Sequence, residues 1–325
     1  MGVIGFQMYL RKKYLRMVEG GSIVIIKKDL EKLIDGEIVE TVAYIKSYDV
    51  RPAKNNNRFI DGMLEMKGSV PFKVWSGATF DELEKYDYRS QVCFITAKVN
   101  EFNGSKSLII NSIKAIAEGT YDPSDFFEEK YQINAYWDAL NKLIQKNCSD
   151  IGVQIFNKVF SDIEDRFKVE FAARGHHDAV RGGLLAHTYK MSFIMSRVIK
   201  MYPNILNALD NDLFVLGASL HDIGKIIEYT NGVIEGNGLI VSHCSFGVEM
   251  LAKHKDFIVG LKNEDFYYRL IAIITQHHGQ YGEPPRCVEA YLVHMVDSLE
   301  STFQSIDEGY EKGLKTINVR EYKLN

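Results

Sequence analysis

The sequence predicts two domains of different secondary structure: a small β-barrel followed by an all-α domain. Apolar and polar residues alternate up to about residue 116, which is typical of strands. From about residue 136, apolar residues instead recur every three or four positions, which is typical of helices packed on one face. A length of 325 residues also suits two domains of ordinary size.

The first domain is predicted to span residues 36–118 and to contain five strands. The first three strands are expected in EIVETVAYIKSYDVR, FIDGMLEM and VPFKVW, and a short helix in ATFDELEKY. The segment QVCFITAKVNEFNGSKSLIINSIKAI predicts two more strands joined by a tight turn at Asn103-Gly104. Five strands with a helix between the third and fourth is the element order of the OB-fold, a small Greek-key barrel.

Such barrels commonly bind single-stranded nucleic acid by stacking bases on aromatic rings beside a basic groove. The candidate nucleic-acid contacts are Tyr48, Arg51, Lys54, Arg58, Phe59, Lys73, Trp75 and Phe102. The alternative is that many of these aromatic side chains belong to the barrel core, and the sequence leaves this open.

The sequence also predicts the boundaries of the helical domain and of the segments that flank the two domains. Residues 1–35 are an N-terminal extension, 119–135 a linker, 136–310 the helical domain and 311–325 a tail. Helices are expected in YWDALNKLIQKN, GVQIFNKVFSDIEDRFKVEFAA, LLAHTYKMSFIMSRVIKMY, DLFVLGASLHDIGKIIEY, HCSFGVEMLAKH, FYYRLIAIITQHH and EAYLVHMVDSLESTFQS. No sheet is expected beyond the linker.

The composition narrows the class of protein. A hydrophobic content of 46% and a net charge of −4 fit a globular protein with a full core, and the charge does not indicate nucleic-acid binding. The four cysteines form no CxxC pair, which favours reduced thiols and a cytoplasmic location. No apolar run approaches the ~20 residues that a membrane span needs. The sequence leaves Met1 and Met17 open as the start of translation.

Histidines are concentrated in the helical domain. All nine follow residue 175, and five of them lie on successive predicted helices together with two aspartates. In chain order these seven residues are His187, His221, Asp222, His243, His277, His278 and Asp297. A lone histidine on an apolar face is usually a hydrogen-bonded core residue, but helices of one bundle can bring this whole set to a common centre. Imidazole and carboxylate together suit divalent transition metals, and an ion would offset the cost of burying His221-Asp222.

The ordered pattern H…HD…H…HH…D resembles that of the HD-domain metal-dependent phosphohydrolases, in their two-metal branch, over roughly residues 174–300. The resemblance implies that His187, His221, Asp222 and Asp297 hold one ion. Asp222 would bridge to a second ion, held by His243, His277 and His278. Mn²⁺ is the favoured metal, and Co²⁺, Fe²⁺, Ni²⁺ and Zn²⁺ remain open.

The resemblance also implies roles for residues beside the ligands. Asp222 and Lys225 are the expected catalytic residues, with Lys225 facing the phosphate; the alternative is a solvent-facing lysine beyond a helix end. The segment AARGHHDAVRGG supplies the candidate substrate contacts Arg174, His176, His177 and Arg181. These residues equally suit a cap for the turn before Gly182-Gly183.

The substrate class follows from the domain combination. The GYP element of cyclic-dinucleotide phosphodiesterases and the Pro-Phe-Gly segment of deoxynucleotide triphosphohydrolases are both missing. An OB-like barrel joined to GGLLAHT and HDIGK is instead similar to the YhaM-type 3′→5′ exoribonucleases, over about residues 36–306. This resemblance implies removal of nucleoside 5′-monophosphates from single-stranded RNA, with single-stranded DNA as a further candidate.

Two alternatives stay open. One is an HD phosphohydrolase for a small nucleotide that uses the barrel to form a homo-oligomer. The other is a nucleic-acid-binding adaptor with a structural metal site.

Overall fold

The structure is a computed structural model that describes residues 30–53, 57–117, 123–127, 130–173, 180–234 and 236–311. The chain divides into two compact units, Met1–Glu128 and Glu129–Asn325.

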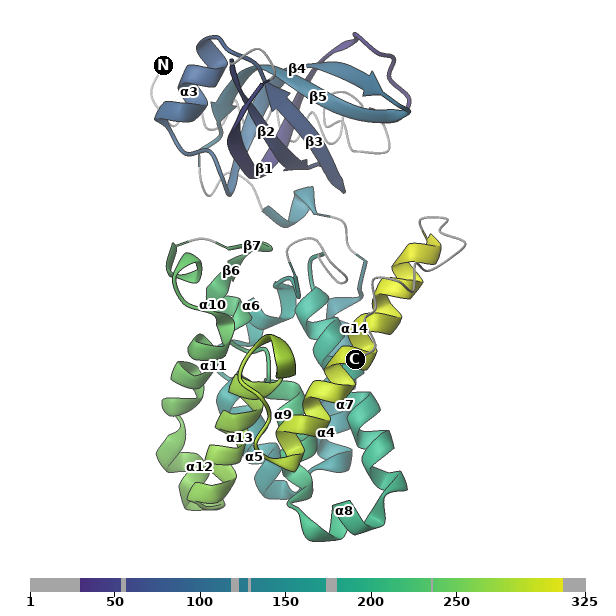
Figure 1. Ribbon diagram of the computed structural model, residues 1–325, viewed down its shortest axis with the longest axis vertical. Helices are drawn as coiled ribbons and strands as arrows, with labels where there is room; N and C mark the ends of the chain where they lie inside the picture. Colours follow the sequence, from purple (N-terminus) through teal and green to yellow (C-terminus); the bar gives the residue numbers. More distant parts are fainter. Residues whose placement is uncertain are drawn as a thin grey trace. The chain divides into compact units, whose positions relative to one another are not determined.

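The first unit is a closed five-stranded barrel with the strand order β1-β2-β3-β5-β4 (Figure 1). The strands are β1 (Ile38–Pro52), β2 (Arg58–Glu65), β3 (Ser69–Val74), β4 (Gln91–Phe102) and β5 (Ser105–Ala115). Strand β3 runs parallel to β5, and the other pairs, including β1 with β4, are antiparallel. Helix α3 (Ala78–Lys85) lies between β3 and β4, so the predicted OB-like barrel is confirmed.

The turn between β4 and β5 follows from its two residues. Asn103 and Gly104 have φ of 51° and 76°, the left-handed conformations that a two-residue hairpin of this type requires. The described strand pairs shift register at two places, in β4 against β5 between Thr96 and Ala97, and in β1 against β2 between Ile45 and Ser47. This irregularity changes which side chains of β1 face the core.

Part of the predicted linker 119–135 packs on the barrel, whereas its residues 133–135 already belong to the first helix of the second unit. The short 3-10 helix η1 (Pro123–Phe126) is followed by Phe127, and both phenylalanines are buried. The backbone N–H of Lys67 donates to the Phe126 carbonyl at 2.7 Å, and the rings of Phe127 and Tyr44 meet edge to face with centroids 5.0 Å apart. These residues therefore belong to the barrel unit rather than to a free connection.

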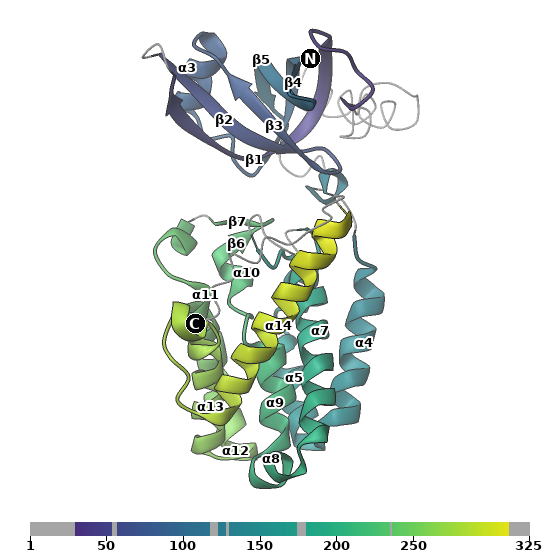
Figure 2. The same cartoon turned by 45° about the vertical axis from the view of Figure 1, so that its right-hand side comes forward.

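The second unit is a bundle of helices (Figure 2). Its α-helices are α4 (Ile133–Asn147), α5 (Asp150–Phe160), α6 (Glu164–Val169), α7 (Gly183–Val198), α8 (Pro203–Ala208), α9 (Asn211–Leu220), α10 (Lys225–Glu228), α11 (His243–Ala252), α12 (Lys255–Leu261), α13 (Glu264–Gln276) and α14 (Val288–Glu311). Its 3-10 turns are η2 (Ile199–Met201), η3 (Gly236–Leu239) and η4 (Gly279–Tyr281). None of the described helices combines the length and apolarity that crossing a membrane takes.

The expectation of a purely helical domain is wrong at one place. Strands β6 (Tyr229–Thr230) and β7 (Val233–Ile234) form a short antiparallel pair. Asn231 and Gly232 make the turn with φ of 50° and 76°. The buried Glu170 carboxylate accepts from the backbone N–H of Gly232 at 3.0 Å, which ties this hairpin to the segment after α6. Two-residue strands leave too little alternation for a sequence pattern to reveal.

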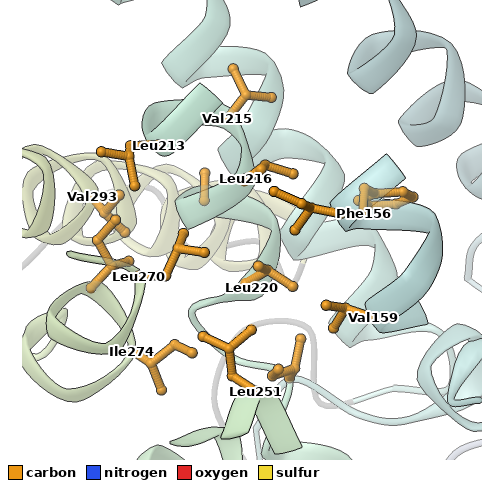
Figure 3. Packing of buried hydrophobic residues seen from close by; sticks show 14 of the residues in the cluster. Phe156, Val159, Leu213, Val215, Leu216, Leu220, Leu251, Leu270, Ile274 and Val293 are labelled. Atoms are coloured by element: carbon orange, nitrogen blue, oxygen red, sulfur yellow. The ribbon is translucent and has the colours of Figure 1, made fainter. Parts of the chain in front are cut away.

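Helix α9 forms the centre of the helical core. Every residue from Asp212 to Leu220 is buried, as expected for a helix that is apolar on all sides. Figure 3 shows Leu213, Leu216 and Leu220 surrounded by apolar side chains of neighbouring helices, among them Phe156, Leu270 and Val293. His221 and Asp222 directly follow Leu220, so this polar pair also lies in the interior of the bundle.

Candidate metal centre

The seven predicted ligands come from five helices and converge inside the helical unit. His187 lies on α7 and Asp297 on α14, while His243 is the first residue of α11. The pairs His221-Asp222 and His277-His278 directly follow α9 and α13. Each of these adjacent pairs therefore sits where a buried helix ends, with both side chains near the same centre.

One group of side chains surrounds His187. Its Nε2 atom lies 3.3 Å from Nε2 of His221 and 3.2 Å from Oδ1 of Asp297. The Nε2 atom of His221 is in turn 3.2 Å from Oδ2 of Asp222. His187 and His221 are almost fully buried, whereas the Asp297 side chain retains 19% exposure.

A second group surrounds His243. Its Nε2 atom lies 2.9 Å from Nε2 of His278. The Nε2 atoms of His243 and His277 are each 3.5 Å from Oδ1 of Asp222. Asp222 thus presents Oδ2 to the first group and Oδ1 to the second, which is the geometry expected of a bridging carboxylate.

The partners of the other ring nitrogens fix which lone pairs face inward. Nδ1 of His221 donates to the Ala218 carbonyl and Nδ1 of His277 to the Ile274 carbonyl, both at 2.9 Å. A carbonyl oxygen only accepts, so these Nδ1 atoms carry protons, and Nε2 is the atom of each ring that can offer a lone pair to a metal ion. Both lone pairs therefore point into the centre.

Two glutamates hold the rings of His187 and His243 through their Nδ1 atoms, and sequence analysis missed both. Glu300 on α14 accepts from Nδ1 of His187 at 2.6 Å, and Glu228 on α10 accepts from Nδ1 of His243 at 2.8 Å. Carboxylates in this position orient metal-binding histidines and make them better donors. One available signal was spacing, because Glu300 follows Asp297 by three residues on one helix and therefore shares its face.

Carboxylates raise the pKa of two histidines of the centre, whereas burial lowers that of His277 and, together with the neighbouring His277, lowers that of His278 to about 3. Burial lowers the pKa of His187, but hydrogen bonds with Asp297 and Glu300 outweigh it and raise that pKa to about 10. For His243, burial is likewise outweighed by contacts with Cys244 and Glu228, and its pKa rises to about 9. Burial raises the pKa of Asp222, yet Lys225 and His221 hold it well below its usual range. The same carboxylates that stabilise these protons would stabilise a cation.

Two buried atoms support a metal ion more directly. Oδ1 of Asp222 and Nε2 of His277 have no hydrogen-bond partner, although these residues are only 3% and 1% exposed. An unsatisfied buried carboxylate oxygen and imidazole lone pair would each cost free energy. The described residues form three groups of side chains that could hold a metal ion, and within each group the donor atoms lie within 4.8 Å of one another. The residues present therefore fit one or two divalent ions.

Gly224 allows the polar pair to reach the second group. A Cβ atom at this position would lie 1.9 Å from the His243 carbonyl oxygen and 2.5 Å from the Gly247 nitrogen. The helix α11 backbone therefore lies against the segment that follows His221-Asp222. A glycine at this position of HDIGK is required by close packing, since its φ of −67° is open to any residue.

Lys225 lies at the centre rather than in solvent. Its Nζ atom is 2.7 Å from Oδ2 of Asp222, and only 13% of its side chain is exposed. Burial lowers the pKa of Lys225, but the Asp222 carboxylate outweighs this effect and raises it, so the lysine stays charged.

Of the four candidate substrate contacts, only Arg181 lies in the described part of the chain. It precedes α7, and its buried Nε atom has no hydrogen-bond partner there. Arg174, His176 and His177 lie outside the described residues.

In the barrel, the prediction for Tyr48 is corrected. Its side chain belongs to the core and is only 4% exposed. Its hydroxyl oxygen accepts from the Tyr88 backbone N–H at 3.1 Å, and the Arg89 guanidinium covers its ring at 4.3 Å. The register shift in β1 turns Tyr48 inward, so a base cannot stack on it.

Other aromatic candidates form a small exposed group. The rings of Phe59 on β2 and Trp75 after β3 have centroids 5.1 Å apart, and Trp75 is 47% exposed. Lys73 places its Nζ atom 5.6 Å from the centre of the Phe59 ring. Arg51 is paired with Phe59 across β1 and β2, so these four side chains share one area of the barrel surface.

The remaining candidates are less favourably placed for binding a strand. Arg58 forms a bidentate ion pair with Glu84, with N–O distances of 2.6 and 3.0 Å. Arg51 itself pairs with Asp61 at 3.5 Å. Phe102 is 73% exposed at the β4–β5 hairpin, and Lys54 lies outside the described residues.

The fold and the converging His and Asp side chains define the class of the second unit. Residues 184–302 match the HD domain family, and this range includes all seven predicted ligands. The chain therefore contains the domain of a hydrolase, as the histidine pattern predicted.

Similarity to individual proteins extends across both units. The protein named 3'-5' exoribonuclease YhaM from Bacillus pumilus (strain SAFR-032) is 27% identical over 292 residues, covering 85% of this chain and 88% of the relative. The protein of the same name from Listeria monocytogenes serotype 4b (strain F2365) is 28% identical over 294 residues, covering 86% and 90%. The resemblance to YhaM-type proteins that the motifs predicted is thereby confirmed.

A partial likeness to a solved structure concerns one quarter of the chain. The mitochondrial single-stranded DNA binding protein Rim1 from S. cerevisiae is 18% identical with a TM-score of 0.24, covering 26% of this chain and 99% of its own.

Proposed function

We propose that this protein is a metal-dependent 3′→5′ exonuclease that releases nucleoside 5′-monophosphates from single-stranded RNA. The observation that carries the proposal is the buried convergence of seven donor residues around Asp222. The relatives named exoribonuclease supply the substrate class. Single-stranded DNA is the natural second substrate to test, because stacking and phosphate contacts do not require a 2′-hydroxyl.

The chemistry divides between the ions and the chain. Bound divalent ions supply Lewis-acid polarisation of a phosphoryl group and lower the pKa of water. His187, His221, Asp222 and Asp297 would hold one ion, and His243, His277 and His278 the other, with Asp222 between them.

The chain's own contribution is to keep this arrangement rigid and charged. Glu300 and Glu228 fix the orientation of two imidazoles, and backbone carbonyls fix two more. Lys225 places a fixed positive charge beside Asp222, where it would stabilise negative charge that develops on the phosphoryl oxygens. Such groups need no reorganisation during the reaction, because their neighbours already hold them in place.

The barrel would hold the strand without reading its sequence. The rings of Phe59, which is partly exposed, and Trp75, which is exposed, are available for bases to stack on. Lys73 and Arg51 lie beside these rings and could contact phosphates. One base stacked on an aromatic ring contributes roughly 1–3 kcal/mol to binding.

One observation favours the alternative of a small-nucleotide phosphohydrolase. Arg51 and Arg58 are both engaged in ion pairs with barrel carboxylates, so the barrel surface offers fewer free cations to a phosphate backbone. An enzyme for small substrates would not need that surface.

A gel assay with 5′-labelled single-stranded RNA separates the two functions. The exonuclease produces a ladder of products shortened from the 3′ end, and excess chelator abolishes it. Added Mn²⁺, Co²⁺ or Zn²⁺ restores it. Hydrolysis of nucleotides or a small phosphodiester with RNA left intact would establish the alternative instead.

A further inference from the structure

One thiol lies beside the candidate metal centre. Cys244 follows His243 in the first turn of α11, and its side chain is half-buried. Its sulfur and one donor atom each from His243, His277 and His278 all lie within 4.8 Å of one another. Three imidazoles and a thiol therefore surround one position.

The surroundings of Cys244 differ from those of Cys93 and Cys148. Burial raises the pKa of the Cys93 thiol to about 12 inside the barrel core. Burial, together with the nearby Asp212, does the same for Cys148, which packs against the helical core. Those thiols behave as small apolar side chains. Cys244 instead faces imidazole nitrogens, which makes simple core packing a poor explanation of its place.

A second observation in the same group points to a ligand. Nε2 of His277 has no hydrogen-bond partner, and its residue is only 1% exposed. Because Nδ1 of His277 donates to Ile274, Nε2 is the donor atom left to a ligand, and it lies 3.5 Å from Oδ1 of Asp222. His277 also belongs to the group of donors that contains Cys244. Imidazole nitrogen and thiolate sulfur are the donors that Zn²⁺ binds in proteins.

We propose that Cys244 is an additional protein ligand of the second metal position. This inference rests on the metal centre of the proposed function. On binding, the thiol releases its proton to solvent, and its sulfur donates an electron pair to the ion without any change of oxidation state. Thiolate selects softer ions than carboxylate does, so this position takes Zn²⁺ or Co²⁺ in preference to Mn²⁺.

The two metal positions consequently differ in chemistry. The group around His187 combines imidazoles with the carboxylates of Asp297 and Asp222 and includes no sulfur. The group around His243 combines imidazoles with a thiol and shares only the Asp222 carboxylate. The first suits Mn²⁺ or Fe²⁺ and the second a borderline ion, so a mixed pair of metals is expected.

Cobalt spectroscopy on the full-length protein tests the ligand directly. The protein is stripped of metal, reconstituted with Co²⁺ alone under reducing conditions, and its absorption spectrum is recorded. Wild-type protein should show a thiolate-to-cobalt charge-transfer band in the near ultraviolet, together with visible bands from cobalt in the protein.

Variants assign the sulfur to its residue. Cys244→Ala and the nearly isosteric Cys244→Ser should both lose the ultraviolet band and keep visible cobalt bands, whereas the control Cys148→Ala should keep both. The same Cys244 variants should bind Zn²⁺ at least about tenfold more weakly, with Mn²⁺ binding nearly unchanged.

The outcomes separate this inference from the proposed function. Visible cobalt bands without the ultraviolet band in wild type, or an ultraviolet band that persists in Cys244→Ala, would overturn the role of Cys244 and leave the metal centre standing. Absence of all cobalt bands in wild type would overturn both.

Discussion

The interior of the helical unit and the outer surface of the barrel illustrate two kinds of functional region. In the helical unit, polar side chains are buried together and held by specific partners, as when Glu300 fixes His187. On the barrel, the candidate residues are exposed, and several are paired with nearby carboxylates. Burying polar groups is costly without compensation, so the first arrangement points to a ligand much more strongly than the second.

The largest expected effect comes from breaking the buried centre at Asp222, which the proposal places between the two metal positions. Asp222→Ala should reduce RNA hydrolysis to background, because Asp222 faces both groups of histidines. His243→Ala removes a ligand from one group only and should leave measurable activity. Initial rates at saturating metal compare the two variants, with circular dichroism to confirm that both remain helical. Equal partial losses would contradict a bridging role.

The next largest effect is expected at Gly224, where close packing against α11 keeps His221 and Asp222 near His243. Gly224→Ala places a methyl group against the α11 backbone, so His243 must move and metal binding should be largely lost. Overpacking of this kind also costs roughly 1–3 kcal/mol in free energy of unfolding. Gly260→Ala on α12 is the matched control, because a Cβ there meets no atom within 4 Å. Calorimetric titration with Zn²⁺ or Mn²⁺ measures the metal affinity of each variant. Similar affinities for the two variants would refute the packing argument.

Smaller losses are expected from the two glutamates behind the ligands. Glu300→Gln and Glu228→Gln keep the shape of the side chain but exchange the carboxylate for a neutral amide. Each should weaken metal binding by about 10–100-fold, the usual effect of removing such a partner. Glu300→Gln should act on the position beside His187, and Glu228→Gln on the position beside His243. Identical effects of both variants on the same binding step would contradict this division.

The smallest effect is expected on the barrel surface. Trp75→Ala should weaken binding of single-stranded RNA by about 1 kcal/mol, the lower end for a stacked base, since the ring already packs on Phe59. Fluorescence anisotropy with a labelled oligonucleotide measures this, and hydrolysis of a small phosphodiester should not change. Phe102→Ala at the β4–β5 hairpin serves as the comparison. Unchanged RNA affinity in the Trp75 variant would remove the barrel's stacking role and favour the small-nucleotide alternative.

The sequence predicted the elements that have strong local causes. The Asn103-Gly104 turn, the barrel strands and the helices carrying the ligands all follow from periodicity or turn chemistry. The order of the histidines also predicted the centre, because buried polar residues on apolar helices stand out against their neighbours. Each of these features can be read from a short stretch of chain.

Features that depend on partners distant in sequence were missed. Glu228 looks like any charged residue near a helix end, and its role depends on His243 lying beside it. Tyr48 appeared to be a surface aromatic because a strand pattern does not reveal the register shift in β1. The docking of Phe126 and Phe127 on the barrel likewise depends on the three-dimensional surface that receives them.

The number of ions that the purified protein retains tests the central claim most directly. Full-length protein is stripped with a chelator, reloaded with Mn²⁺ and Zn²⁺ together, dialysed against metal-free buffer and submitted to elemental analysis beside Asp222→Ala. The buried centre predicts about two divalent ions per wild-type chain and a clear loss in the variant. Wild-type protein that retains no ion, or a variant that retains the same number, would contradict it.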